Sequence, residues 1–132
     1  MDESHHGSCL CGAVRYRVNG ALKAFTHCHC RKCQKAHGAA FATYASAPIS
    51  SVEIEAEPGV LKGYESSPGV IRQFCSACGS SLFWSDTRGR FADWISITVA
   101  SLDSPVQPGK QRQGCVEERV GWYGVEGESS NL

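Results

Sequence analysis

The sequence predicts an all-β fold, a small domain made of many short strands. Apolar residues recur at every second position in several segments, which is the period of a strand with one buried face. Glycine and proline turn signals separate these segments, as in domains made of many short strands. Cysteines stand in close clusters early and late in the chain, a spacing that suits a tetrahedral zinc ion joining distant strands.

The first predicted strand covers residues 14–18. Val14, Tyr16 and Val18 alternate with arginines there, so one face is expected to be buried and the other wet. The dipeptide Asn19-Gly20 follows as a turn signal and ends the strand.

The next part of the chain predicts one helix and two strands. Residues 31–37 are the only segment that we expect to be helical, over a turn or two directly after a group of cysteines. A short strand is expected at 39–44. Another is expected at 52–56, where Val52 and Ile54 alternate with glutamates.

Four more strands are expected before the end of the domain. Short apolar runs bounded by turn signals lie at 60–64, 70–74 and 81–84. Residues 95–99 alternate Ile and Val with Ser and Thr, which again predicts one buried face. Residues 105–113 are rich in Pro, Gln and Gly and are expected to form a surface loop.

The domain organisation predicted is simple. A chain of 132 residues suits one domain, which we place at residues 1–123, because no repeat or linker divides it. Residues 124–132 have little to bury and are expected to be a disordered tail.

Charge and hydropathy exclude several classes of function. Thirteen basic residues balance thirteen acidic ones, which argues against a nucleic-acid binder or an anionic-membrane binder. No apolar run is long enough to span a membrane, and the N-terminus lacks the apolar stretch of a signal peptide. We therefore expect a cytoplasmic protein, in which clustered cysteines act as metal ligands rather than as disulfides.

The first metal site is predicted from two cysteine pairs. Cys9 and Cys11 point to the same side if they lie on a strand, and Cys75 and Cys78 have the spacing of a knuckle, with Gly79 after it. Four thiolates favour zinc over oxygen-seeking ions, and the spacings match neither ferredoxin pattern of an iron–sulfur cluster. We expect this zinc to be structural and to tie distant strands together.

The second metal site is predicted from a cysteine triplet. Cys28, Cys30 and Cys33 fill three positions of a tetrahedron, whereas catalytic zinc sites keep one position open. The candidates for that position are solvent, a substrate, and the side chains Cys115, His27, His29 and His37. We expect the histidines to be loop residues or hydrogen-bond donors to the ligands.

Three thiolates and an open position suit thiol chemistry. They leave zinc with a net negative charge, so it is a weaker acid towards water than a three-histidine zinc, but it still favours a soft ligand. An external thiol bound there would lose its proton and could attack an electrophile. Arg31, Lys32 and Lys35 either offset the negative charge or form a solvated helix face.

Three motifs resemble the glutathione-dependent formaldehyde-activating enzyme family, which includes centromere protein V. They are Gly7-Ser-Cys-Leu-Cys-Gly-Ala-Val-Arg-Tyr16, Cys28-His-Cys-Arg-Lys-Cys33 and Phe74-Cys-Ser-Ala-Cys-Gly-Ser80. The resemblance extends over residues 7–122 and is specific when the motifs are taken together.

The resemblance implies an antiparallel β fold similar to the Mss4-like zinc-binding fold. It also implies two zinc ions per chain, a structural one on four cysteines and a second on three: Cys9, Cys11, Cys75 and Cys78, then Cys28, Cys30 and Cys33. The reaction implied is the addition of glutathione to formaldehyde, giving S-hydroxymethylglutathione, which is classed as a carbon–sulfur lyase reaction in reverse.

Two positions depart from the family pattern. Family members commonly carry a histidine where this chain has Gln113, and Cys115 is not part of the pattern. The alternative to an enzyme is a non-catalytic zinc module that binds a protein partner, with both metal sites structural.

Overall fold

The computed structural model describes residues 3–124, so the expected tail at 124–132 lies outside the described residues except for its first residue. Within that part of the chain, no helix has the length and apolar character needed to cross a membrane. The strands and the α-helix follow one another in this order: β1 (Ser4–Ser8), β2 (Arg15–Asn19), β3 (Lys23–Cys28), α1 (Arg31–His37), β4 (Ala42–Pro48), β5 (Val52–Glu55), β6 (Leu61–Ser67), β7 (Val70–Cys75), β8 (Ser81–Asp86), β9 (Trp94–Thr98) and β10 (Gln111–Gly114). Short 3-10 helices are interspersed: η1 (Ile49–Ser51), η2 (Gly89–Phe91), η3 (Val99–Ser101) and η4 (Val116–Glu118).

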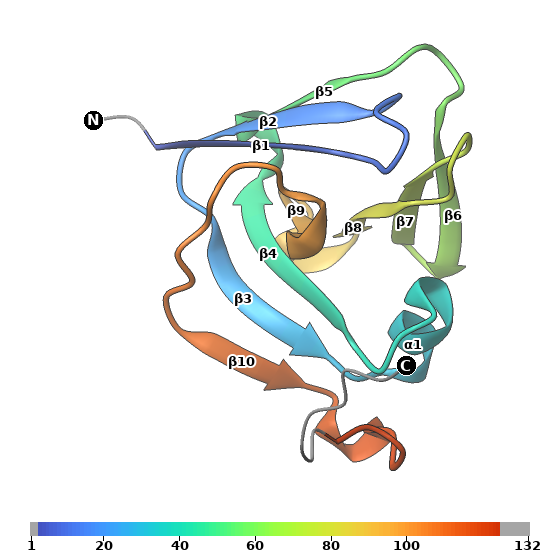
Figure 1. Ribbon diagram of the computed structural model, residues 1–132. Helices are drawn as coiled ribbons and strands as arrows, with labels where there is room; N and C mark the ends of the chain where they lie inside the picture. The colour runs from blue at the N-terminus through green and yellow to red at the C-terminus, as the bar shows by residue number, and fades with distance from the viewer. Residues whose placement is uncertain (1–2, 125–132) are drawn as a thin grey trace, which may run out of the picture.

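The strands form two sheets, which confirms the predicted β fold. Strands β1, β2 and β5 make a three-stranded antiparallel sheet, and the larger sheet has the order β10-β3-β4-β9-β8-β7-β6. Figure 1 shows the smaller sheet lying across one end of the larger one, with α1 at the opposite end. All pairs in the larger sheet are antiparallel except β10 with β3, which run parallel.

The main core contains buried residues of β2, β4, β8 and β9. Val14, Tyr16 and Val18 are all buried, as their alternation predicts. The Tyr16 ring meets the edge of Phe83 with ring centroids 5.2 Å apart, and Leu82 and other apolar side chains surround them. Two cysteines of the first cluster belong to this core, so a metal bound there would be continuous with the apolar packing.

Several details differ from the expectation. The segment 105–113 is not wholly a loop, because its end forms β10, and strands β1 and β3 were not predicted. These strands carry polar residues and show no regular alternation of apolar with polar residues, so their sequences give no clear strand signal. On β5 the predicted buried face is only partly formed, since Ile54 is 40% exposed.

Helix α1 covers the predicted residues 31–37 and positions part of the cysteine triplet. Cys30 is its N-cap residue, and the Cys30 Sγ accepts a hydrogen bond from the Cys33 N–H at 3.3 Å. Gly38 ends the helix in the left-handed conformation, with φ of 59°.

Candidate metal centres and active site

The first cysteine cluster joins two turns that are far apart in the sequence. The sulfur atoms of Cys9, Cys11, Cys75 and Cys78 all lie within 4.8 Å of one another. Cys9 Sγ lies 3.7 Å from Cys11 Sγ, which in turn lies 3.8 Å from Cys75 Sγ. A tetrahedron with zinc–sulfur bonds of about 2.3 Å has edges of about 3.8 Å, so the four sulfur atoms fit a zinc ion.

The prediction that Cys9 and Cys11 lie on a strand is wrong. They occupy the turn between β1 and β2, where the Gly12 N–H donates to the Cys9 carbonyl at 3.1 Å. The Val14 N–H donates to Cys9 Sγ at 3.2 Å. The chain therefore brings both sulfur atoms together by turning, not by strand alternation.

The second turn of this cluster has the predicted knuckle form. Gly79 adopts φ of 83°, which a residue with a side chain resists, and its N–H donates to the Cys75 carbonyl at 2.7 Å. The Ser80 hydroxyl lies 3.2 Å from Cys78 Sγ, and this hydrogen bond lowers the pKa of Cys78 to about 5. Ser80 also accepts from the Leu10 N–H at 2.9 Å, so it links the two turns.

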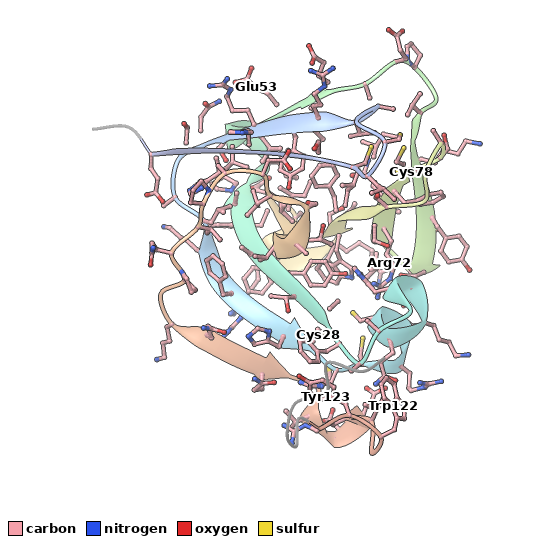
Figure 2. The ribbon with its side chains drawn as sticks, in the orientation of Figure 1. Cys28, Glu53, Arg72, Cys78, Trp122 and Tyr123 are labelled. Atoms are coloured by element: carbon pink, nitrogen blue, oxygen red, sulfur yellow. The ribbon has the colours of Figure 1, made fainter. Side chains whose placement is uncertain are left out.

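The cysteine triplet lies elsewhere in the molecule, where β3 leads into α1. Figure 2 shows Cys28 well apart from Cys78 of the first cluster. The sulfur atoms of Cys28, Cys30 and Cys33 lie within 4.8 Å of one another, as required of three ligands on one ion. They pack with Ala42 and other residues in a small apolar cluster separate from the main core.

Arg72 on β7 is the main charged partner of the triplet, and sequence reasoning missed it. Both terminal nitrogens of its guanidinium lie 3.6 Å from Cys33 Sγ and donate to it. Nη1 also donates to the Tyr44 hydroxyl at 3.4 Å, and that hydroxyl pairs with His37 Nε2 at 2.9 Å. Burial, and then the Arg72 charge, lower the pKa of His37.

The basic residues of α1 do not donate hydrogen bonds to the cysteine triplet as Arg72 does. Arg31 and Lys32 donate hydrogen bonds to Gln34 and Ser67, and Lys35 is exposed in the last turn of the helix. The only sequence signal for Arg72 is a single charge inside an apolar strand, and that signal does not identify its partner.

The three thiols of the triplet do not share protons equally. The Cys33 thiol donates a hydrogen bond to the Cys28 sulfur, which lowers the pKa of Cys28 to about 5. The same contact, together with burial, raises the pKa of Cys33. Cys28 is therefore the sulfur that carries negative charge most readily, and a metal bound here would have to displace the proton of Cys33.

The nearby histidines differ from the expectation, because His27 lies on β3 and His37 on α1, and the hydrogen bonds described for them and for His29 go to residues other than the cysteines. His27 pairs with Gln111 Oε1 at 2.6 Å and with Thr43 Oγ1 at 2.8 Å. His29 Nε2 lies 2.7 Å from Gln113 Oε1, so the residue in place of the family histidine is a hydrogen-bond partner of His29.

Cys115 lies beside the triplet but outside its group of three sulfur atoms. It follows β10 in the left-handed conformation, with φ of 53°, and its side chain is exposed. Partial desolvation of the thiol by neighbouring atoms, and then the charge of Cys28, raise the pKa of Cys115 to about 11. Its sulfur lies within 4.8 Å of carboxylate oxygens of Glu117 and Glu118, and it also makes a hydrogen bond with Cys28.

A cavity of about 720 Å³ opens directly at the triplet. Cys28, Cys30 and Cys33 line one end, and Tyr44, Arg72 and Cys115 also contribute to its wall. A metal ion held by the triplet would therefore face a space large enough for an external ligand.

Comparison with known proteins agrees with the geometry of the site. The family model described as "Glutathione-dependent formaldehyde-activating enzyme" matches residues 4–117. A protein of Halomonas elongata, provisionally named as such an enzyme, is 31% identical over 128 residues, covering 91% of this chain and 80% of its own. A Schizosaccharomyces pombe protein named as an uncharacterised lyase is 28% identical over 91 residues, covering 65% of this chain and 61% of its own.

A solved structure shows the same fold. The crystal structure of a Rhodobacter sphaeroides protein superposes with a TM-score of 0.63 at 25% sequence identity, and the match covers 82% of this chain and 98% of the other. With the family model matching most of the chain and both cysteine clusters assembled, the protein belongs to the glutathione-dependent formaldehyde-activating enzyme family.

Proposed function

We propose that the protein is a lyase-like enzyme that takes up a small thiol, glutathione, at the zinc site of Cys28, Cys30 and Cys33 and adds it to an aldehyde such as formaldehyde. The observation that carries this proposal is the three-sulfur group at one end of a large cavity. The family membership and the lyase name of one relative support the reaction class.

The residues around the triplet suit this chemistry. Zinc held by three thiolates supplies a soft acceptor that keeps an external thiol deprotonated. The Arg72 guanidinium offsets the negative charge that the sulfur atoms gather, because it donates two hydrogen bonds to Cys33. The Tyr44 hydroxyl lies beside Arg72 on the cavity wall, where it can form a hydrogen bond with a substrate oxygen.

The first test is the zinc content of freshly purified, reduced protein, followed by glutathione titration of a cobalt-substituted sample. We expect two metal ions per chain and a cobalt spectrum that changes when thiol is added. Cys30→Ser should keep one metal ion and lose the spectral response. Cys115→Ser is the matched control, since it removes a cysteine at the same cavity. It should keep two metal ions and the spectral response to thiol.

Other results would change the assignment. A metal ion lost in Cys115→Ser would make Cys115 the fourth ligand and close the site. Two metal ions with no response to glutathione or other small thiols would rule out the proposed enzyme. That result would favour the alternative, a structural zinc module, for which the 73% exposed Trp122 would be a contact residue.

A further inference from the structure

The cavity at the triplet extends far beyond the space that formaldehyde alone needs, and glutathione takes up part of the remainder. Its volume is about 720 Å³, within the range of pockets that bind drug-sized ligands. A molecule with two heavy atoms fills roughly twice the ~30 Å³ share of one water molecule. Most of the cavity is therefore available to groups other than formaldehyde.

One row of paired residues across five strands explains the shape of this space. Lys23 on β3 pairs with Ser46 on β4, Ser46 pairs with Ser96 on β9, Ser96 pairs with Trp84 on β8, and Trp84 pairs with Arg72 on β7. Directly paired residues point to the same face of a sheet. Ser46 and Ser96 are the small residues of this row, so the floor is low between the larger side chains of Lys23 and Trp84.

The two sides of this floor differ in chemistry. Lys23 and Arg112 lie on the β3 and β10 side and carry positive charge. The aromatic residues Trp84 on β8, Trp94 on β9 and Phe91 on η2 lie on the other side. The charged side chains on that side are Arg72, which donates to Cys33, and Asp86 at the end of β8. Trp84 also packs against the apolar cluster that contains Cys33, so the aromatic side is continuous with the triplet.

Each side matches a different part of a thiol adduct. Glutathione carries two carboxylates, which suit the cationic side. Indole and phenyl rings gain most from contact with an apolar or aromatic group. Formaldehyde has no such group, so the aromatic side would have nothing to bind.

We propose that the second reactant is an aldehyde with an aromatic or branched aliphatic substituent, which lies against Trp84 and Trp94 above Ser96. This inference rests on the proposed function and names its substrate class. The thiolate sulfur forms a bond with the carbonyl carbon, the C=O π pair moves to oxygen, and that oxygen takes up the proton that the thiol released. No electron donor or acceptor is needed.

The first test measures binding of two stable glutathione thioethers to the zinc-loaded protein by tryptophan fluorescence. S-benzylglutathione carries an aromatic group and S-methylglutathione does not. The ratio of their dissociation constants therefore measures how much the aromatic side of the cavity contributes to binding. We expect the wild-type protein to bind the benzyl compound at least tenfold more tightly. Equal binding of the two would overturn the inference without any variant.

Two matched variants locate the effect. Ser96→Leu raises the floor beside Trp84 and should bring the ratio close to one. Ser85→Leu makes the same change on β8, one residue from Trp84 and therefore on the opposite face, and should keep the wild-type ratio. A loss of preference in both variants, or in neither, would contradict the placement against Trp84.

The second test measures adduct exchange by NMR with glutathione and either phenylacetaldehyde or formaldehyde. We expect a larger acceleration over the uncatalysed rate for phenylacetaldehyde. Acceleration of formaldehyde alone would overturn the inference and leave the proposed function standing. Acceleration of neither aldehyde would overturn the proposed reaction, and with it the aldehyde as second reactant, even if the benzyl preference persists.

Discussion

At the scale of single residues, Arg72 balances the charge of the triplet. It is half-buried, and its two hydrogen bonds to Cys33 Sγ come from one rigid guanidinium fork. Side chains that orient metal ligands in this way typically affect metal affinity by roughly 10- to 100-fold.

We predict that Arg72→Gln lowers the zinc affinity of the triplet about tenfold and leaves the four-cysteine site unchanged. Competition with a chromogenic chelator should resolve one weakened and one unaltered zinc ion per chain. Arg17→Gln is the control, because Arg17 is exposed on β2. If Arg72→Gln released both zinc ions as the wild-type protein does, the charge of Arg72 would not contribute to zinc binding at the triplet.

At the scale of elements, Gly7 on β1 allows the small sheet to lie against the rest of the fold. A Cβ there would overlap the Tyr16 phenol and would lie 2.6 Å from the Ser101 carbonyl oxygen. The Tyr16 ring is held in this place because its hydroxyl forms a hydrogen bond with Ser101 Oγ at 2.6 Å.

We predict that Gly7→Ala destabilises the domain by about 3 kcal/mol, because neither the ring nor the backbone can move without disturbing the core. Urea unfolding followed by circular dichroism measures the change. Gly109→Ala is the control, since a Cβ at Gly109 meets nothing within 4 Å. Similar stability of the two variants would mean that β1 shifts to make room.

The strands with the clearest sequence signal are two whose apolar residues form a face of the core. Residues 14–18 and 95–99 alternate because alternate side chains pack inside, and the structure buries Val14, Ile95 and Ile97 accordingly. Strand β10 has no such signal, since its Gln, Arg and Gly residues add nothing to the apolar core and its strand form depends on pairing with β3. Predicting a strand of this kind requires knowing which strand it pairs with.

The site was predictable only as far as cysteine spacing allows. The two groups of sulfur atoms assemble as the spacing indicates. Arg72 and the cavity were not predictable, because strand order in the large sheet brings β7, β8 and β9 to the triplet. Short-range motifs carry no information about that order.

At the scale of the whole molecule, the two cysteine clusters have different relations to the core. Cys9 and Cys75 are buried within the main core and link turns that follow β1 and β7. The triplet packs on a smaller cluster of its own. Loss of the first metal ion should therefore affect the entire fold, and loss of the second only the region around α1.

We predict that Cys78→Ser unfolds or aggregates the domain, whereas Cys30→Ser stays folded. The zinc contribution to a small domain is on the order of 10 kcal/mol, comparable with the total stability of about 5–15 kcal/mol. Thermal denaturation, with zinc content measured on the same samples, distinguishes the two variants. Equal collapse of both would show that the two sites do not divide the structural and ligand-binding roles.

Strand β10 has a consequence for how this family can change over evolutionary time. The strand supplies Arg112 to the cavity but no residue of the buried core, and most of it is exposed. Substitutions of the exposed Arg112 can alter the ligand that the cavity admits at little cost in folding free energy. Selection can therefore diversify this edge while every metal ligand is retained, so chains with identical cysteine motifs can diverge in the compounds on which they act.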